Sequence, residues 1–159
     1  MPDAKLQASS IYEKIPCVGD SFDCVVFADS LEHIHQSPLV ILGEIRRVLK
    51  PNGVLILTTP NVMRLENRVK FFLGVNIHPD LYRFVYGERH AQHYREYTKG
   101  EVVTLLCDYA GFNMTGVLLY DYAAARTKIK KLLQVVLRPI GFIAPQLRST
   151  IIAIAKKNA

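Results

Sequence analysis

The sequence predicts an α/β protein in which a helix joins two parallel strands, and three stretches of the chain support this prediction. Residues 22–28 and 54–59 are short runs of apolar and β-branched residues, typical of strands buried on both faces of a parallel sheet. Between them, residues 39–49 carry apolar side chains at helical spacing. A strand, a helix and a strand within about 40 residues form a βαβ unit, whose right-handed crossover makes the two strands parallel neighbours.

The helix between these strands has clear end signals. Ser37 followed by Pro38 is typical of an N-cap and a first helical position. Residues 50–53, Lys-Pro-Asn-Gly, are expected to end the helix. Pro60 and Asn61 are expected to stop the strand that follows.

The second half of the chain predicts one more well-capped helix and two more strands. Thr98 and Glu101 have the spacing of a capping box, in which each side chain satisfies a free backbone N–H at the start of a helix. Gly111 stands where a left-handed residue suits the helix end. Residues 112–120 and 150–155 predict the strands, the first with some alternation and the second solidly apolar.

Residues 62–97 lie between regular elements and contain polar, aromatic and histidine residues with no clean period. A connection of this length is usually functional, for example a cover over a binding site. We therefore interpret residues 62–97 as a lid on the substrate side.

The composition indicates one cytoplasmic globular domain. A chain of 159 residues with 50% hydrophobic content is long enough to bury a core. Its apolar runs are much shorter than a membrane span, and no apolar signal core follows Met1. Three cysteines without a CxxC pair fit neither a disulfide framework nor a zinc site.

The positive charge is concentrated at the C-terminal end. Residues 121–159 carry eight Lys and Arg against one Asp, within a net charge of +6. No zinc finger, helix-turn-helix or RNA-binding aromatic motif accompanies this charge, so we expect no nucleic-acid partner. Residues 121–148 are interpreted as a basic helical insertion whose helix spans residues 123–138. Its charges either form an ordinary solvated face or attach the protein to an anionic membrane near a lipid substrate.

Several segments, in order, resemble one enzyme family. Residues 21–34 look like the "sFDvV…vLEHl" segment of class I S-adenosylmethionine-dependent methyltransferases. Residues 44–53 are similar to the family's "E-x-x-R-V-L-K-P-G-G", with Asn52 in place of the first glycine. Residues 93–98 and 110–112 resemble the "H-x-R-x-Y-T…aGF" segment of its small-molecule O-methyltransferase branch. The resemblance extends over residues 7–120.

The resemblance implies a doubly wound sheet of seven strands in the order 3-2-1-4-5-7-6, with the last strand antiparallel. Residues 5–9 would be strand three, and the four strands predicted above would be strands four to seven. Residues 1–159 would then be a single truncated domain without strands one and two and without the glycine-rich turn between them. No G-x-G-x-x-G run occurs in the chain. Half of the cofactor crevice would be missing, and free S-adenosylmethionine should bind poorly.

A sheet without strand one would leave the strand over residues 22–28 with a bare edge. Such an edge recruits another strand. We therefore expect either a homo-oligomer or a companion chain that carries the missing half.

The resemblance also implies where the cofactor and the substrate would bind. Ala28 and Asp29, with Ser30, would line the cofactor site, and Ser10 and Ile11 would face its adenine. The simpler alternative for Asp29 and Ser30 is an ordinary turn or cap. Residues implied or expected on the substrate side are Asn61, Tyr82, His90 and Tyr97.

Two histidines are candidate catalytic residues. His33 belongs to the "LEHI" motif and either orients a nucleophile or forms a structural hydrogen bond behind the site with its glutamate neighbour. His93 lies in the predicted lid beside several tyrosines, so it is a plausible general base, although an exposed histidine without a role is nearly as common. A metal site built from the histidines at positions 33, 35, 90 and 93 lacks a recognised spacing, and we expect no metal.

The resemblance thus implies methyl transfer to an oxygen of a small molecule, a sugar or a lipid. Such a transfer is an in-line displacement, for which a protein mainly aligns the nucleophile and removes its proton. Two alternatives to methyl transfer remain open. In the first, the chain is a non-catalytic remnant that acts as an oligomeric interaction module. In the second, it is a peripheral membrane protein that binds through its basic C-terminal end.

Overall fold

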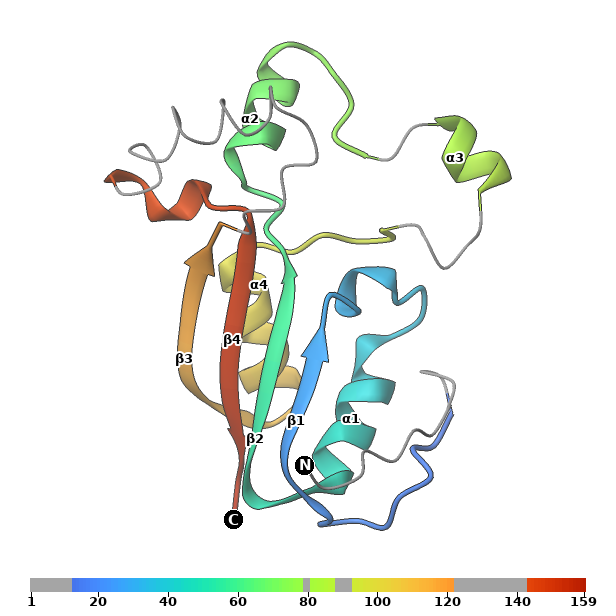
Figure 1. The fold of residues 1–159 in the computed structure, drawn as a ribbon, viewed down its shortest axis with the longest axis vertical. Coiled ribbons are helices and arrows are strands. Elements are labelled where there is room, and N and C mark those ends of the chain that lie inside the picture. Colours follow the sequence, from blue (N-terminus) through green and yellow to red (C-terminus); the bar gives the residue numbers. More distant parts are fainter. Residues whose placement is uncertain (1–12, 79–80, 88–92, 122–142) are drawn as a thin grey trace, which may run out of the picture.

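The computed structural model describes residues 13–78, 81–87, 93–121 and 143–159, and their centre is a four-stranded sheet (Figure 1). The strands are β1 (Phe22–Ala28), β2 (Leu49–Pro60), β3 (Phe112–Tyr120) and β4 (Thr150–Lys157), in the spatial order β1-β2-β4-β3. β1 and β2 are parallel, and β4 is antiparallel to both of its neighbours. The α/β class and the antiparallel last strand are therefore confirmed.

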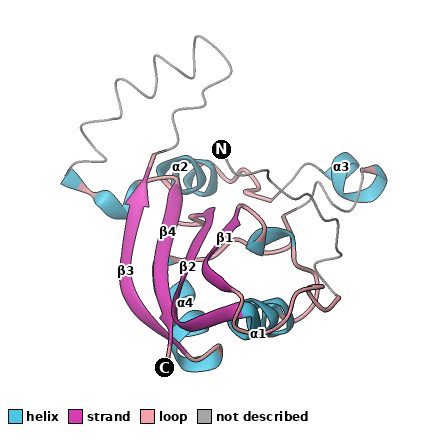
Figure 2. Cartoon of the chain, turned by 60° about the horizontal axis from the view of Figure 1, so that its bottom comes forward, coloured by secondary structure: helices cyan, strands magenta, loops and turns pink. Residues whose placement is uncertain are grey.

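Short helices connect the strands (Figure 2). They are the α-helices α1 (Pro38–Val48), α2 (Leu65–Phe72), α3 (Leu81–Tyr86) and α4 (Lys99–Thr104), the 3₁₀ turns η1 (Leu31–His33) and η4 (Pro145–Leu147), and the π-helical turn η3 (Leu105–Tyr109). α4 continues directly into η3, so the predicted helix after Thr98 forms but changes its winding in its second half.

The core lies on one face of the sheet, where α1, α4 and η3 pack against β2 and β4. Because side chains alternate along a strand, every second residue of β2 and β4 points to this face. Its buried residues include Leu42, Ile45, Leu55, Leu57, Val102, Leu106 and Ile151.

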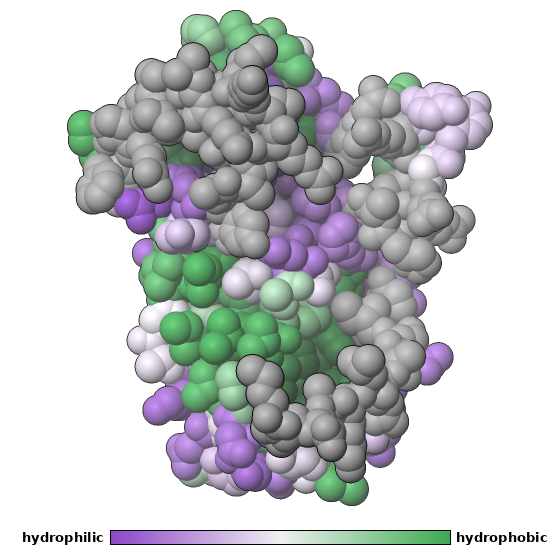
Figure 3. Space-filling view, viewed as in Figure 1, coloured by the Kyte–Doolittle hydropathy of each residue, from purple (hydrophilic) through white to green (hydrophobic). Residues whose placement is uncertain are grey.

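The opposite face of the sheet is apolar but much less covered by the described residues. Val26 is 65% exposed and Leu118 is 46% exposed, and Ile56 and Ile154 are only half-buried. Register places Val26, Ile56 and Ile154 side by side across three strands, and Figure 3 shows this surface in green. The expectation that the strand over residues 22–28 is buried on both faces was wrong, because the described helices pack on one face only.

The local capping predictions are confirmed. Ser37 Oγ accepts a hydrogen bond from the backbone N–H of Leu39. Thr98 Oγ1 accepts from the N–H of Glu101 at 3.1 Å, and the Thr98 N–H donates to Glu101 Oε2 at 2.8 Å. Gly111 has a φ of +69°, the left-handed conformation expected at that helix end.

The start of β2 differs from the prediction. Leu49 already pairs with Phe22, and the next pair is Cys24 with Val54, so residues 50–53 form a bulge inside the strand rather than a linker before it. Asn52 has a φ of +63°, which asparagine adopts more readily than most residues. A Cβ on Gly53 would lie 2.8 Å from the carbonyl oxygen of Lys50, so the bulge needs a glycine there.

The predicted lid over residues 62–97 contains regular structure that its irregular pattern did not indicate, namely α2 and α3. The predicted strand over residues 5–9 and the predicted basic helix over residues 123–138 lie outside the described residues. No helix among the described residues is long and apolar enough to cross a membrane.

Candidate active site

The candidate site lies at the carboxyl ends of the parallel strands β1 and β2. Ligands of open α/β sheets bind beyond the carboxyl ends of the strands. β1 leads through Asp29 and Ser30 into η1, and β2 leads into Asn61, which forms an isolated bridge with Tyr97. The connection back from the predicted lid therefore returns to this edge (Figure 1).

A tight turn follows β1. Asp29 has a φ of +44°, and its carboxylate accepts a hydrogen bond from Thr58 Oγ1 at 3.0 Å. Ser30 Oγ donates to the carbonyl oxygen of Ala28 at 2.8 Å. These bonds fix the turn and leave Ala28 and Asp29 exposed, so both interpretations of Asp29 and Ser30 remain compatible with the geometry.

Glu32 is a buried carboxylate at the centre of this edge. Its side chain is 1% exposed, and Oε2 accepts a hydrogen bond from Thr59 Oγ1 at 2.9 Å. Its backbone oxygen accepts from the N–H of Tyr94 at 2.7 Å, which attaches the connection after the predicted lid to η1. Burial raises the pKa of Glu32 above its ordinary value.

His33 and His93 are 60 positions apart in the sequence and meet at this carboxylate. Their ring centroids are 4.8 Å apart in an edge-to-face arrangement. His33 Nε2 lies 4.0 Å from Glu32 Oε1. One ligand-type atom each of Glu32, His33 and His93 lies within 4.8 Å of the other two. The structure thus brings together both histidines that the sequence nominated as catalytic.

A second, anionic layer supports His93. Glu96 Oε1 lies 3.1 Å from His93 Nδ1, and both Glu96 oxygens accept hydrogen bonds from the guanidinium of Arg64. Burial alone would raise the pKa of Glu96, but the hydrogen bonds from His93 and Arg64 outweigh it and lower the pKa to about 2. The same bond to Glu96 raises the pKa of His93, against the opposing effect of burial.

Glu96 predicts an acid-dependent loss of stability. The pKa of Glu96 falls from 4.5 to about 2 on folding. The contribution of ionised Glu96 to the free energy of unfolding is therefore fully present above about pH 5, and it is lost as the pH falls toward the pKa of about 2 in the folded state. We expect the free energy of unfolding, measured in urea between about pH 7 and pH 3, to fall less in Glu96→Gln than in the unchanged chain. Parallel curves for the two proteins would contradict this assignment.

Sequence reasoning missed part of this site. Thr59, Arg64 and Glu96 were not singled out, and Glu32 entered only as a structural neighbour of His33. The sequence signal for Glu96 was its position three residues after His93 in the "H-x-R-x-Y-T" segment, because side chains at this spacing can hydrogen-bond to each other. Arg64 offered no local signal, because it meets Glu96 across 32 positions.

The other nominated residues fall into two groups. Asn61 and Tyr97 are buried at the same edge, but the Asn61 amide bonds to the backbone of Met63, Gln146 and Arg148, and the Tyr97 ring lies under the Arg95 guanidinium. Tyr82 lies on α3, where its ring packs 5.0 Å from Tyr86. The positions Ser10, Ile11 and His90 lie outside the described residues.

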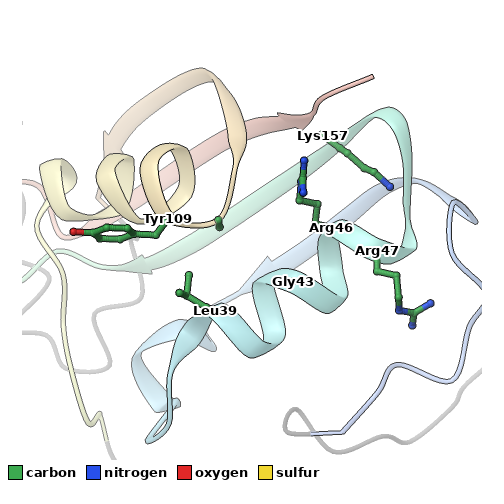
Figure 4. Close-up of a pocket in the computed structure, with 7 residues that line it drawn as sticks. Leu39, Gly43, Arg46, Arg47, Tyr109 and Lys157 are labelled. Atoms are coloured by element: carbon green, nitrogen blue, oxygen red, sulfur yellow. The ribbon is translucent and has the colours of Figure 1, made fainter.

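The structure has two cavities near the sheet. One, of about 640 Å³, is lined by residues of the connection after η1 and of α4, with Ile34, Arg95 and Tyr97 among them, and by none of the three cluster residues. The other, of about 300 Å³, lies near the C-terminal end of α1, where Arg46 and Arg47 line it together with Lys157 (Figure 4). Arg47 and Lys157 form ion pairs with Glu44 and Asp20, whereas the buried Nε of Arg46 has no hydrogen-bond partner among the described residues.

Comparison with known proteins identifies the family. A family model described as "Methyltransferase domain" matches residues 4–117. The chain belongs to this methyltransferase family. A search of the curated proteins finds no significant match.

Solved structures agree with this assignment at the level of the fold. An S-adenosylmethionine-dependent methyltransferase from Methanosarcina mazei superposes with a TM-score of 0.64 at 18% identity, over 98% of this chain and 68% of its own. One from Archaeoglobus fulgidus gives 0.57 at 16% identity, over 94% and 66%. One from Mesorhizobium loti gives 0.56 at 13% identity, over 93% and 67%. The methyltransferase chain described here thus spans about two thirds of the length of these structures.

The family implies S-adenosylmethionine as the cofactor, and the described residues fit one wall of a site for it. β1 is an edge strand of the described sheet, and Ala28, Asp29 and Ser30 lie at its carboxyl end. Ala28 and Asp29 are exposed there. These are the positions that the resemblance assigns to the cofactor.

Proposed function

We propose that this methyltransferase domain transfers a methyl group to a hydroxyl oxygen of a small molecule, a sugar or a lipid. The observation that carries the proposal is the cluster of Glu32, His33 and His93 at the carboxyl ends of β1 and β2. A hydroxyl is a weak nucleophile at neutral pH, and groups that remove or stabilise its proton are what such a reaction needs.

Each residue of the cluster has a distinct role in this proposal. His33 and His93 bind the acceptor hydroxyl and draw off its proton as the oxygen attacks. Glu32 and Glu96 orient the two imidazoles and balance the positive charge that the proton brings. Thr59 and Arg64 fix the two carboxylates, through the hydrogen bonds described above.

The cofactor side of the proposal concerns Ala28, Asp29 and Ser30. Bound S-adenosylmethionine supplies a methyl group on a positively charged sulfur, which leaves as a neutral thioether. The three residues at the end of β1 would hold it next to the cluster, and Ser10 and Ile11 are proposed to face its adenine. Residues 62–97 are proposed to close over the acceptor and exclude water.

We further propose that the β1 edge pairs either with a companion chain that supplies the glycine-rich half of the cofactor site, or with a second copy of this chain. This follows from the absence of a G-x-G-x-x-G run in the 159 residues and from the exposed edge of β1 in the described sheet. A crevice with one wall makes few contacts with a ligand and cannot bury it.

Calorimetry tests this incomplete crevice. We expect the isolated chain to show no micromolar affinity for S-adenosylmethionine, because the 159 residues contain no glycine-rich run to form the other wall of an α/β crevice. Addition of a chain with a strand, a glycine-rich loop and a helix is expected to restore binding. Micromolar binding by the isolated chain would contradict the proposal.

Methyl transfer itself is tested with the complemented protein. Transfer of a labelled methyl group to a panel of hydroxyl, amine and thiol acceptors is expected to favour hydroxyl compounds. Activity confined to amines or thiols would overturn the oxygen acceptor while leaving the family assignment unchanged.

The alternative of a non-catalytic interaction module is favoured by one observation, the apolar sheet face around Val26, Ile56 and Ile154. An oligomer that covers this face would not need the ordered histidine and carboxylate cluster. The cluster therefore favours the enzyme over the module.

A further inference from the structure

We propose that Glu32, His33 and His93 together bind one divalent transition-metal ion. Only the catalytic role of that ion, activation of the acceptor hydroxyl, rests on the proposed function. The inference departs from our expectation from sequence that the chain holds no metal, an expectation based on histidine spacing alone.

The donor atoms are close enough for a shared ion. One oxygen or nitrogen atom from each of the three residues lies within 4.8 Å of the others. Ligand atoms around a tetrahedral Zn²⁺ lie about 3.4 Å apart, since each metal–ligand distance is about 2.1 Å. The donor atoms would have to approach one another by up to about 1.4 Å to reach this spacing, through rotation of the His33 and His93 side chains.

The two chain segments that supply the donors are already joined. Glu32 and His33 belong to η1, and His93 precedes Tyr94, whose N–H donates to the Glu32 backbone oxygen at 2.7 Å. The site does not have to be assembled by the metal from distant segments. This lowers the ordering cost that a metal would otherwise have to offset.

Hydrogen bonds in the surrounding layer direct the donor atoms inward. His93 Nδ1 faces Glu96, so its Nε2 is the nitrogen left to bind a metal, and Glu96 is itself held by Arg64. Histidine ligands of metals ordinarily donate their second N–H to a carboxylate in this way. Thr59 occupies Oε2 of Glu32, and Oε1 is the oxygen that faces His33 Nε2.

Charge balance points in the same direction. Glu32 is buried, and the described residues place no Lys or Arg within salt-bridge distance of it. A buried carboxylate is stable when it is paired or coordinates a metal. A divalent ion at the three donors would supply the missing positive charge.

The donor set suggests which ion. One carboxylate and two imidazoles, with no sulfur, suit Zn²⁺, Co²⁺ or Mn²⁺, and three protein ligands leave a position for the substrate. The acceptor hydroxyl would bind there, and the metal would lower its pKa. With the ion bound, His33 and His93 hold the metal instead of taking the acceptor proton, which passes to water. The oxygen then forms a C–O bond to the methyl carbon, and the C–S bond breaks with its electron pair left on sulfur.

Metal binding is measured on the full chain without a purification tag, cofactor or acceptor. Titration with Zn²⁺ by calorimetry and with Co²⁺ by visible absorption is expected to give one equivalent per chain. His33→Gln and His93→Gln should each weaken binding at least tenfold, and Glu96→Gln should weaken it by about 10- to 100-fold. His35→Gln is the matched control, because His35 is exposed and packs on Tyr94 outside the cluster.

Circular dichroism of each variant shows that a loss of binding is not a loss of fold. A thiolate charge-transfer band with Co²⁺, unchanged affinity in both His33→Gln and His93→Gln, or no stoichiometric binding would each overturn the metal site. Since neither cofactor nor acceptor is present, such a result leaves the proposed methyl transfer standing. A chain that binds metal but transfers no methyl group when complemented would contradict the proposed function alone.

Discussion

Replacement of Arg64 by methionine is expected to lower the free energy of unfolding by about 3 kcal/mol, because the buried Glu96 carboxylate loses both guanidinium hydrogen bonds and keeps only those to His93 and Asn67. The side chains of Arg64 and Glu96 are only 19% and 14% exposed, so water replaces the lost guanidinium poorly. Arg64 also donates to the backbone oxygen of Asn61 at 3.1 Å, which is lost at the same time. Equilibrium urea unfolding measures the difference.

The variants Glu96→Gln and Arg64→Met with Glu96→Gln complete a double-mutant cycle. The double variant is expected to be more stable than Arg64→Met alone, since it no longer buries a carboxylate charge that has lost its guanidinium partner. Arg68→Met is the matched control, because Arg68 is exposed and, among the described residues, its guanidinium donates to the backbone oxygen of Met63. This substitution should change the free energy of unfolding by no more than about 0.5 kcal/mol. A cost below 1 kcal/mol for Arg64→Met would show that the pair is screened like a surface ion pair.

The sequence predicted those parts of the fold that local chemistry determines. The helix that begins at Pro38, the capping box at Thr98 and the left-handed Gly111 each depend on residues within a few positions, and all three form. The strand pair β1 and β2 follows from the βαβ rule and is also confirmed. The bulge over residues 50–53 was missed, because a Pro-Asn-Gly segment is equally typical of a helix end.

The burial of β1 was not predictable from the sequence. An apolar strand such as residues 22–28 is equally compatible with cover on both faces or on one, and the described helices cover one. Which face is covered depends on elements far along the chain or on another chain. A continuous run of apolar residues carries no information about that.

The candidate site was half predictable for a similar reason. His33 and His93 could be nominated because each belongs to a motif of residues close in sequence. Their meeting depends on the hydrogen bond from Tyr94 to Glu32, across 62 positions, which no spacing rule contains. Thr59 and Arg64 reach the cluster because β2 ends beside η1. That neighbourhood follows from the pairing of β1 with β2 and not from any local sequence pattern.

Substitution of His93 by glutamine is expected to reduce kcat of the complemented enzyme by about a hundredfold or more, the contribution typical of a group that moves a proton in the transition state. Glutamine fills a similar space and still reaches Glu96, but it neither accepts a proton nor replaces an imidazole ligand. S-adenosylmethionine affinity should stay within about twofold of the unchanged protein, because the cofactor is assigned to Ala28, Asp29 and Ser30 and not to His93. Steady-state kinetics with calorimetry separate the two quantities.

His35→Gln supplies the comparison for this substitution as well. It removes an imidazole two positions from His33, on the exposed side of the same connection, and should retain kcat. If His93→Gln lowered cofactor affinity and left kcat intact, His93 would belong to the cofactor site. If both variants kept full activity, the cluster at the ends of β1 and β2 would stabilise the fold without activating the acceptor. Removal of a group that activates the acceptor hydroxyl must slow methyl transfer.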